Sequence, residues 1–131
     1  MDRTKNHNNI MPDCSELTKF LSIQDWSTCR RISSQLIYAI DDFVQANSNL
    51  NLVKYQDILQ ASGIEWDIDS MTNADVDSLD IVTVLALLVA AYRADHFSNG
   101  AFDEFIQNGS IRKWLVRLEK RVYPKFCVNT K

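Results

Sequence analysis

The sequence predicts an all-α domain in which about six helices pack around one central apolar helix. The chain has 131 residues, which is close to the commonest size of a single domain. It contains only three glycines and two prolines, whereas β-sandwiches and barrels need many turn residues. We expect a flexible polar leader over residues 1–12, one domain over 13–123 and a flexible tail over 124–131.

The first two predicted helices follow polar residues that can cap them. The first spans residues 14–22, with Asp13 as its N-cap and Glu16 three residues later, as in a capping box. The second spans residues 28–46 after Ser27 as N-cap, and its apolar side chains fall on one arc of the helix.

The third predicted helix spans residues 51–62 and ends at Gly63, since glycine readily adopts the left-handed conformation that closes many helices. Residues 64–69 then alternate apolar and acidic side chains with a period of two. A lone strand would have no partner in this sequence, so we expect a short extended segment here. Its side chains expected to be buried are Ile64, Trp66 and Ile68.

The central apolar helix is predicted over residues 78–96. Asp75 and Asp77 precede it, and their negative charges suit the positive end of a helix. Its apolar run over residues 81–92 is too short for a membrane span and is typical of a helix buried in a protein core. A strip of small residues would let a neighbour approach closely: Thr83, Ala86, Ala90 and Ala94.

Two further helices complete the predicted fold. A short helix over residues 101–108 ends at Gly109. A final amphipathic helix begins with Ser110 as its N-cap and ends before Pro124.

The cysteines and the N-terminus indicate an intracellular protein. The three cysteines (Cys14, Cys29 and Cys127) form no CxxC pair, and an odd number cannot make a closed disulfide framework. The first twelve residues lack the apolar stretch of a secretory signal. We therefore expect a cytoplasmic protein with reduced thiols and no membrane partner.

The segment that follows the central helix carries a recognisable pattern. Residues 92–100 read Tyr-Arg-Ala-Asp-His-Phe-Ser-Asn-Gly, and they are followed by Phe102, Gly109, Ile111, Trp114, Leu115 and Leu118. This run resembles the C-terminal signature of a family of small uncharacterised bacterial and phage helical proteins. In that signature an Arg-x-x-x-Phe-x-x-Gly element precedes a short helix, a glycine turn and an amphipathic final helix. The resemblance covers residues 79–118, implies a helical fold and a bacterial or phage source, and carries no activity.

Neither an enzyme active site nor a metal site is expected. Asp95 and His96 are adjacent on the predicted helix, so their side chains diverge by about 100° and cannot pair simply. His96 falls on a largely apolar face, which favours a packed structural histidine. EF-hand loops that start at Asp67 or Asp75 would lack required ligands. Without a phosphate loop or a hydrolase motif, we expect no catalytic residue, no cofactor and no dedicated metal.

The net charge of −3 conceals a strong division along the chain. Residues 41–104 contain twelve acids and two bases, whereas residues 105–131 contain seven bases and one acid. The densest acids, which we call the acidic lobe, are Glu65, Asp67, Asp69, Asp75, Asp77 and Asp80. The bases on the final helix, which we call the basic stripe, are Lys113, Arg117, Lys120 and Arg121.

Three interpretations of this division stay open. The charges can be purely structural, with acids that cap the central helix and keep the surface soluble, bases that complement a helix C-terminus, and partial pairing between the acidic lobe and the basic stripe. The acidic lobe can bind a basic protein partner, because complementary charge speeds and orients association. The basic stripe can contact nucleic acid, although it is small and lacks stacking aromatic residues.

The function that we expect is protein–protein contact through the acidic lobe, as a non-enzymatic inhibitor or accessory factor, including one of the anti-defence type. Nucleic-acid binding through the basic stripe is the alternative. Tyr38 lies on the polar face of the second helix near Arg31, and these two residue types are enriched in binding hot spots. A homodimer is a further expectation, because the central helix needs extensive cover.

Overall fold

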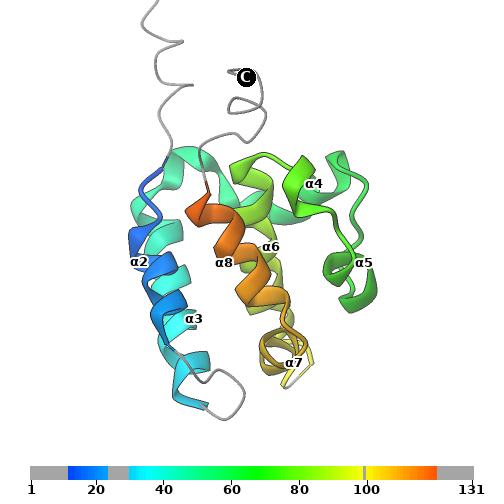
Figure 1. Ribbon diagram of the computed structural model, residues 1–131. Helices are drawn as coiled ribbons and strands as arrows, with labels where there is room; N and C mark the ends of the chain where they lie inside the picture. The colour runs from blue at the N-terminus through cyan, green and yellow to red at the C-terminus, as the bar shows by residue number, and fades with distance from the viewer. Residues whose placement is uncertain (1–11, 24–29, 99, 121–131) are drawn as a thin grey trace, which may run out of the picture.

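The computed structural model describes residues 12–23, 30–98 and 100–120, which form an all-α fold with no β-strand among them (Figure 1). The predicted fold class is therefore confirmed. The α-helices in these ranges are α2 (Ser15–Thr18), α3 (Arg30–Ala46), α4 (Tyr55–Ala61), α5 (Ile68–Thr72), α6 (Ile81–Ala94), α7 (Ala101–Gln107) and α8 (Ser110–Glu119). Short 3₁₀ turns are η1 (Lys19–Ser22), η2 (Ser48–Leu50), η3 (Leu52–Lys54) and η4 (Val76–Ser78).

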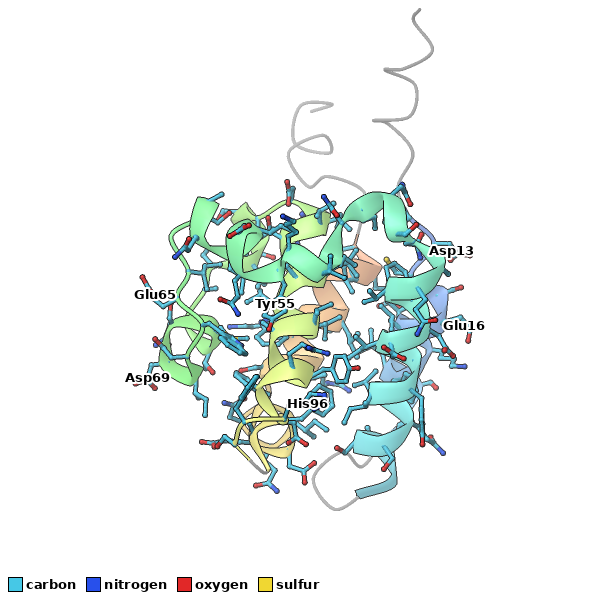
Figure 2. The ribbon with its side chains drawn as sticks, turned by 180° about the vertical axis from the view of Figure 1, so that it is seen from behind. Asp13, Glu16, Tyr55, Glu65, Asp69 and His96 are labelled. Atoms are coloured by element: carbon cyan, nitrogen blue, oxygen red, sulfur yellow. The ribbon has the colours of Figure 1, made fainter. Side chains whose placement is uncertain are left out.

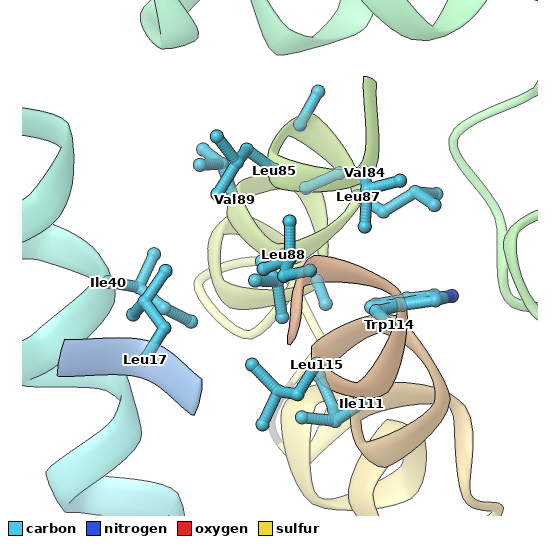
Figure 3. Close-up of a cluster of buried hydrophobic side chains, with 14 of the residues drawn as sticks. Leu17, Ile40, Val84, Leu85, Leu87, Leu88, Val89, Ile111, Trp114 and Leu115 are labelled. Atoms are coloured by element: carbon cyan, nitrogen blue, oxygen red, sulfur yellow. The ribbon is translucent and has the colours of Figure 1, made fainter. Parts of the chain in front are cut away.

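Helix α6 forms the centre of the fold. Ten of its fourteen residues are buried, and α3, α4, α7 and α8 all pack against it. Burying one aliphatic side chain of this kind stabilises a fold by about 1.5–3 kcal/mol. The predicted central helix is thus present. Figure 3 shows the side chains that gather around it, which include Leu17, Ile40, Ile111, Trp114 and Leu115.

The start of α6 differs from the prediction. Asp80 is its N-cap, and the carboxylate accepts a hydrogen bond from the backbone N–H of Thr83 at 2.8 Å. Asp75 and Asp77 belong instead to the separate turn η4 and its cap position. Leu79 is extended after this turn, and it separates η4 from the helix.

The cover of α6 comes from its own chain. Figure 1 shows α8 lying along α6, with α2 and α3 on one side and α4 and α5 on the other. The predicted strip of small residues is buried, apart from Ala94, which is half-buried. Because neighbouring elements already cover α6, the reason for expecting a homodimer is removed.

Helix α4 ends as predicted, in a Schellman motif at Gly63. Gly63 has φ +75°, its N–H donates to the carbonyl of Gln60 at 2.9 Å, and the N–H of Ile64 donates to that of Leu59 at 3.0 Å. Ile64 and Leu59 are both buried, which gives the apolar contact that accompanies this motif.

The extended segment predicted over residues 64–69 is shorter than expected. Asp67 is extended and serves as N-cap of α5, because its carboxylate accepts from the N–H of Ser70 at 2.7 Å. Ile68 is therefore the first residue of a helix. Ile64 is buried, whereas Trp66 and Ile68 are half-buried against the core.

Other helix ends also differ from the prediction. The first predicted helix is divided into α2 and η1, and the Asp13 carboxylate accepts from the N–H of Ser15 at 3.0 Å. The third begins later than predicted, because the turn η3 follows Asn51, which has φ 59°, and α4 starts only at Tyr55. Ser110 is the first residue of α8 rather than its cap, which is Gly109 with φ +87°. The tail, the leader before Pro12, and Ser27 and Thr28 lie outside the described residues.

Replacing Gly63 by alanine tests the Schellman motif. A Cβ at this position would have no atom within 4 Å, so its cost comes from the left-handed backbone alone. We expect Gly63→Ala to lower the free energy of unfolding by about 1 kcal/mol, and Gly63→Asn to lower it less. Urea unfolding followed by circular dichroism measures both values, and an unchanged value for Gly63→Ala would contradict the assignment.

Candidate functional site

A groove of about 820 Å³ lies between α5, the C-terminal end of α6 and α7, and we call it the acidic groove. Its buried lining is apolar, from Met71, Ala101 and Phe105. The more exposed apolar lining comes from Trp66, Ile68 and Phe97. The charged side chains in the groove are Asp67 at the start of α5, Asp69 on α5 and Glu104 on α7, all three exposed.

Trp66 lines one side of this groove, and two contacts fix the orientation of its side chain. Its indole N–H donates to the carbonyl of Ala90 in α6 at 3.0 Å, which the small alanine side chain leaves within reach. Its ring also meets Tyr55 edge to face, with centroids 5.5 Å apart. The indole therefore has a fixed orientation although it is only half-buried.

Phe97 stands in the turn between α6 and α7 and is 76% exposed. The Asp95 carboxylate closes this turn by accepting from the N–H groups of Gly100 and Phe102, both at 3.1 Å. Gly100 has φ +90°, a conformation that suits glycine. The Phe97 ring lies perpendicular to Trp66, with centroids 5.7 Å apart.

The structure divides the acidic lobe into three places. Asp67 and Asp69 line the acidic groove and Glu65 lies next to them, and Figure 2 shows Glu65 and Asp69 pointing outward on one flank. Asp80 caps α6. The other two, Asp75 and Asp77, line a second groove of about 560 Å³ beside α8. Glu104, which completes the acidic groove, was not among the residues predicted.

One residue of the basic stripe, Arg117, is buried in the core and does not lie on the surface as predicted. Arg117 is 4% exposed, and its guanidinium donates to the carbonyls of Val76 at 3.0 Å, Leu79 at 2.8 Å and Lys120 at 3.1 Å. Arg117 is therefore not available to contact a phosphate, and it joins α8 to η4. Lys113 is exposed, and its ammonium donates to the carbonyl of Thr72 at 3.0 Å.

In the part of the chain that the structure describes, the basic stripe thus contacts the segment of the acidic lobe through hydrogen bonds from its side chains to backbone carbonyls, and not through carboxylates. Lys113 and Lys120 line the same second groove as Asp75 and Asp77. Within the described residues, no ion pair joins an acid of the acidic lobe to a base of the basic stripe. Arg121 lies outside the described residues.

Tyr38, the other sequence-predicted contact residue, is 72% exposed on α3. It lines a groove of about 750 Å³ between η1 and α3, next to Phe20 and Phe43. The side chain of Arg31 lies outside the described residues, so only its position in α3 is known.

The polar cluster near the end of α6 is structural. Tyr92 donates a hydrogen bond to the Asp41 carboxylate at 3.2 Å and so ties α6 to α3. Burial, together with the negative charge of Asp41, raises the pKa of Tyr92. His96 is exposed, which corrects the expectation of a packed histidine, and its ring lies 5.8 Å from that of Tyr92.

No group of three or more His, Cys, Asp or Glu side chains in the described residues is placed to hold a metal ion. Among the helices described, none has the length and apolar character needed to cross a bilayer.

The structural role of Arg117 predicts a large loss of stability in Arg117→Ala. A hydrogen bond to a charged group contributes about 1.5–3 kcal/mol, and the buried carbonyls would lose their donor. We expect the free energy of unfolding to fall by about 2–3 kcal/mol, and by less than about 1 kcal/mol in Lys113→Ala, because Lys113 is exposed. Equal small losses in the two variants, measured by urea unfolding, would contradict this role.

Comparison with known proteins confirms the resemblance to an uncharacterised family. Residues 29–123 match a family of unknown function, DUF6508. Comparisons with curated proteins and with solved structures found no significant match. The matched range extends beyond the recognisable C-terminal pattern and includes α3 to α8, hence every element that lines the acidic groove. The chain belongs to the DUF6508 family of unknown function.

Proposed function

We propose that the protein is a non-enzymatic binding protein that contacts a basic protein partner through the acidic groove. The observation that carries this proposal is the combination of exposed aromatic surface and unopposed negative charge in one groove of about 820 Å³. The groove at Tyr38 also contains acids and aromatic residues, but Lys19 lies among them, and the groove at Asp75 and Asp77 contains Lys113 and Lys120.

The charge of the groove favours a basic partner. Among the described residues that line it, every charged side chain is acidic. Glu65, Asp69 and Glu104 have exposed side chains that make no hydrogen bond or ion pair within the described residues. Their negative potential would raise the association rate of a basic surface and would repel nucleic acid.

The aromatic lining supplies the apolar part of an interface. Burying a phenylalanine side chain contributes about 1.5–3 kcal/mol. Because Phe97 is largely exposed, most of this free energy would be gained only when a partner buries it. Aromatic residues at the centre of a contact, surrounded by polar residues, are typical of protein interfaces. A basic nucleic-acid channel of another protein is one such partner surface, and occupying it would make this chain an inhibitor.

Nucleic acid is the less supported partner. Arg117 is committed to the core, which leaves Lys113 and Lys120 as the exposed members of the basic stripe in the described residues. Both lie in a groove that also contains Asp75 and Asp77, and these acids oppose the approach of phosphate.

Selection of a random peptide display library against the protein tests the proposal. We expect the selected peptides to be rich in Lys and Arg and to contain apolar residues. Their affinity should fall at least about tenfold in the triple variant Glu65→Lys, Asp69→Lys, Glu104→Lys, because attraction becomes repulsion. It should also fall as salt is added.

A matched triple variant controls for charge. Asp42→Lys, Asp57→Lys and Asp77→Lys change the net charge equally at exposed acids outside the groove. Asp57 and Asp69 both lie in the first turn of a short helix, so the helix-dipole cost is similar. Retained binding in this control supports the proposal. Equal loss in both triple variants, or selection of peptides without basic residues, contradicts it.

A further inference from the structure

The exposure of Phe97 is built into the fold rather than produced by a fraying end. Its N–H donates to the carbonyl of Ala94 at 3.0 Å, and the Asp95 carboxylate fixes the rest of the turn through two backbone N–H groups. Three large apolar side chains in the described residues are exposed: Tyr38, Val53 and Phe97. Of these, Phe97 makes a defined ring-to-ring contact, with Trp66, and lines a groove whose described residues include no base, whereas the groove that Tyr38 lines also contains Lys19.

Trp66 and Phe97 form a right-angled aromatic corner that borders the acidic groove. Their rings are perpendicular, with centroids 5.7 Å apart, and both residues line the groove. A cation within about 6 Å of an aromatic centroid is attracted to the negative face of the ring. Ala90 and Tyr55 already fix the Trp66 side chain in the free protein, so this side chain loses little conformational entropy on binding.

The carboxylates on the two sides of the groove have no partner of their own. Asp69 on α5 and Glu104 on α7 make no side-chain hydrogen bond or ion pair within the described residues, whereas Asp67 is engaged as a helix cap. If an apolar side chain of the partner filled the groove, the carboxylates would lose their hydrogen bonds to water and gain no other donor, which is unfavourable. A cationic side chain avoids this cost.

We infer that the groove anchors a lysine or arginine side chain of the partner, with its aliphatic stem against Phe97 and Trp66 and its charged end near Asp69 and Glu104. Long basic side chains pack in this way because the stem is apolar while the head is charged. This inference rests on the proposed function and names the chemistry of the residue that is recognised. Phe97 would be the specificity-determining residue of the site.

The probe is an oligo-arginine peptide, compared with the same peptide in which citrulline replaces arginine. Citrulline keeps the length and shape of the side chain but is neutral. We expect isothermal titration calorimetry at low salt to give the citrulline peptide an affinity at least about tenfold weaker. Asp69→Asn combined with Glu104→Gln should weaken the oligo-arginine peptide by a similar factor.

The aromatic part of the inference is tested at Phe97. Phe97→Leu keeps an apolar side chain but removes the ring face, and we expect it to weaken oligo-arginine binding about fivefold. Phe97→Ala should weaken it further. Val53→Ala, at an exposed apolar residue outside the groove, should leave binding unchanged. Because Phe97 is largely exposed, its variants should keep the melting temperature of the parent protein.

The possible results separate the two proposals. Binding that depends on Asp69 and Glu104 but not on Phe97 overturns the basic anchor at the aromatic corner and leaves the proposed function standing. Binding that is the same in all variants overturns both. Self-association that is lost in Phe97→Ala would show that a second copy occupies the groove, and it would overturn the inference as well.

Discussion

The burial of α6 is the constraint on which the rest of the structure depends. A helix that is apolar on every side must be enclosed, and α3, α4, α7 and α8 are arranged to enclose it. Residues 83–91 are all buried and the cover then decreases, since Ala94 is half-buried and Phe97 is exposed. The acidic groove lies where the enclosure of α6 ends, so the candidate site is a direct consequence of how the core is built.

The charged residues serve different purposes at the two ends of this core. Near the start of α6, Asp80 caps the helix and Arg117 binds the carbonyls of Val76 and Leu79, so charge is used to hold the fold together. At the other end, the Asp69 and Glu104 carboxylates make no hydrogen bond or ion pair within the described residues, and each lies in the first turn of its helix. Exposed carboxylates that form no internal contact either keep the surface soluble or contact a partner, and the proposed function rests on the second of these uses.

The sequence predicted the features that depend on local patterns and missed those that depend on distant contacts. The apolar run of α6 and the left-handed Gly63 were predicted because hydrophobic spacing and glycine at a helix end are local signals. The internal role of Arg117 could not be predicted, since its acceptors lie about forty residues away in sequence. The role of Phe97 was missed because its exposure and its contact with Trp66 are set by the tertiary fold. The half-buried helical position of Ile68 was missed because Asp67 caps a short helix within an alternating pattern.

Chemical-shift mapping with ¹⁵N-labelled protein and an oligo-arginine peptide would show whether the acidic groove is the binding surface of the protein. We expect the largest shifts for the backbone amides of residues 66–71, 94–98 and 100–105 and for the indole N–H of Trp66, which is fixed at the groove. Shifts concentrated in the groove between η1 and α3, or spread evenly over the exposed acids, would contradict this expectation.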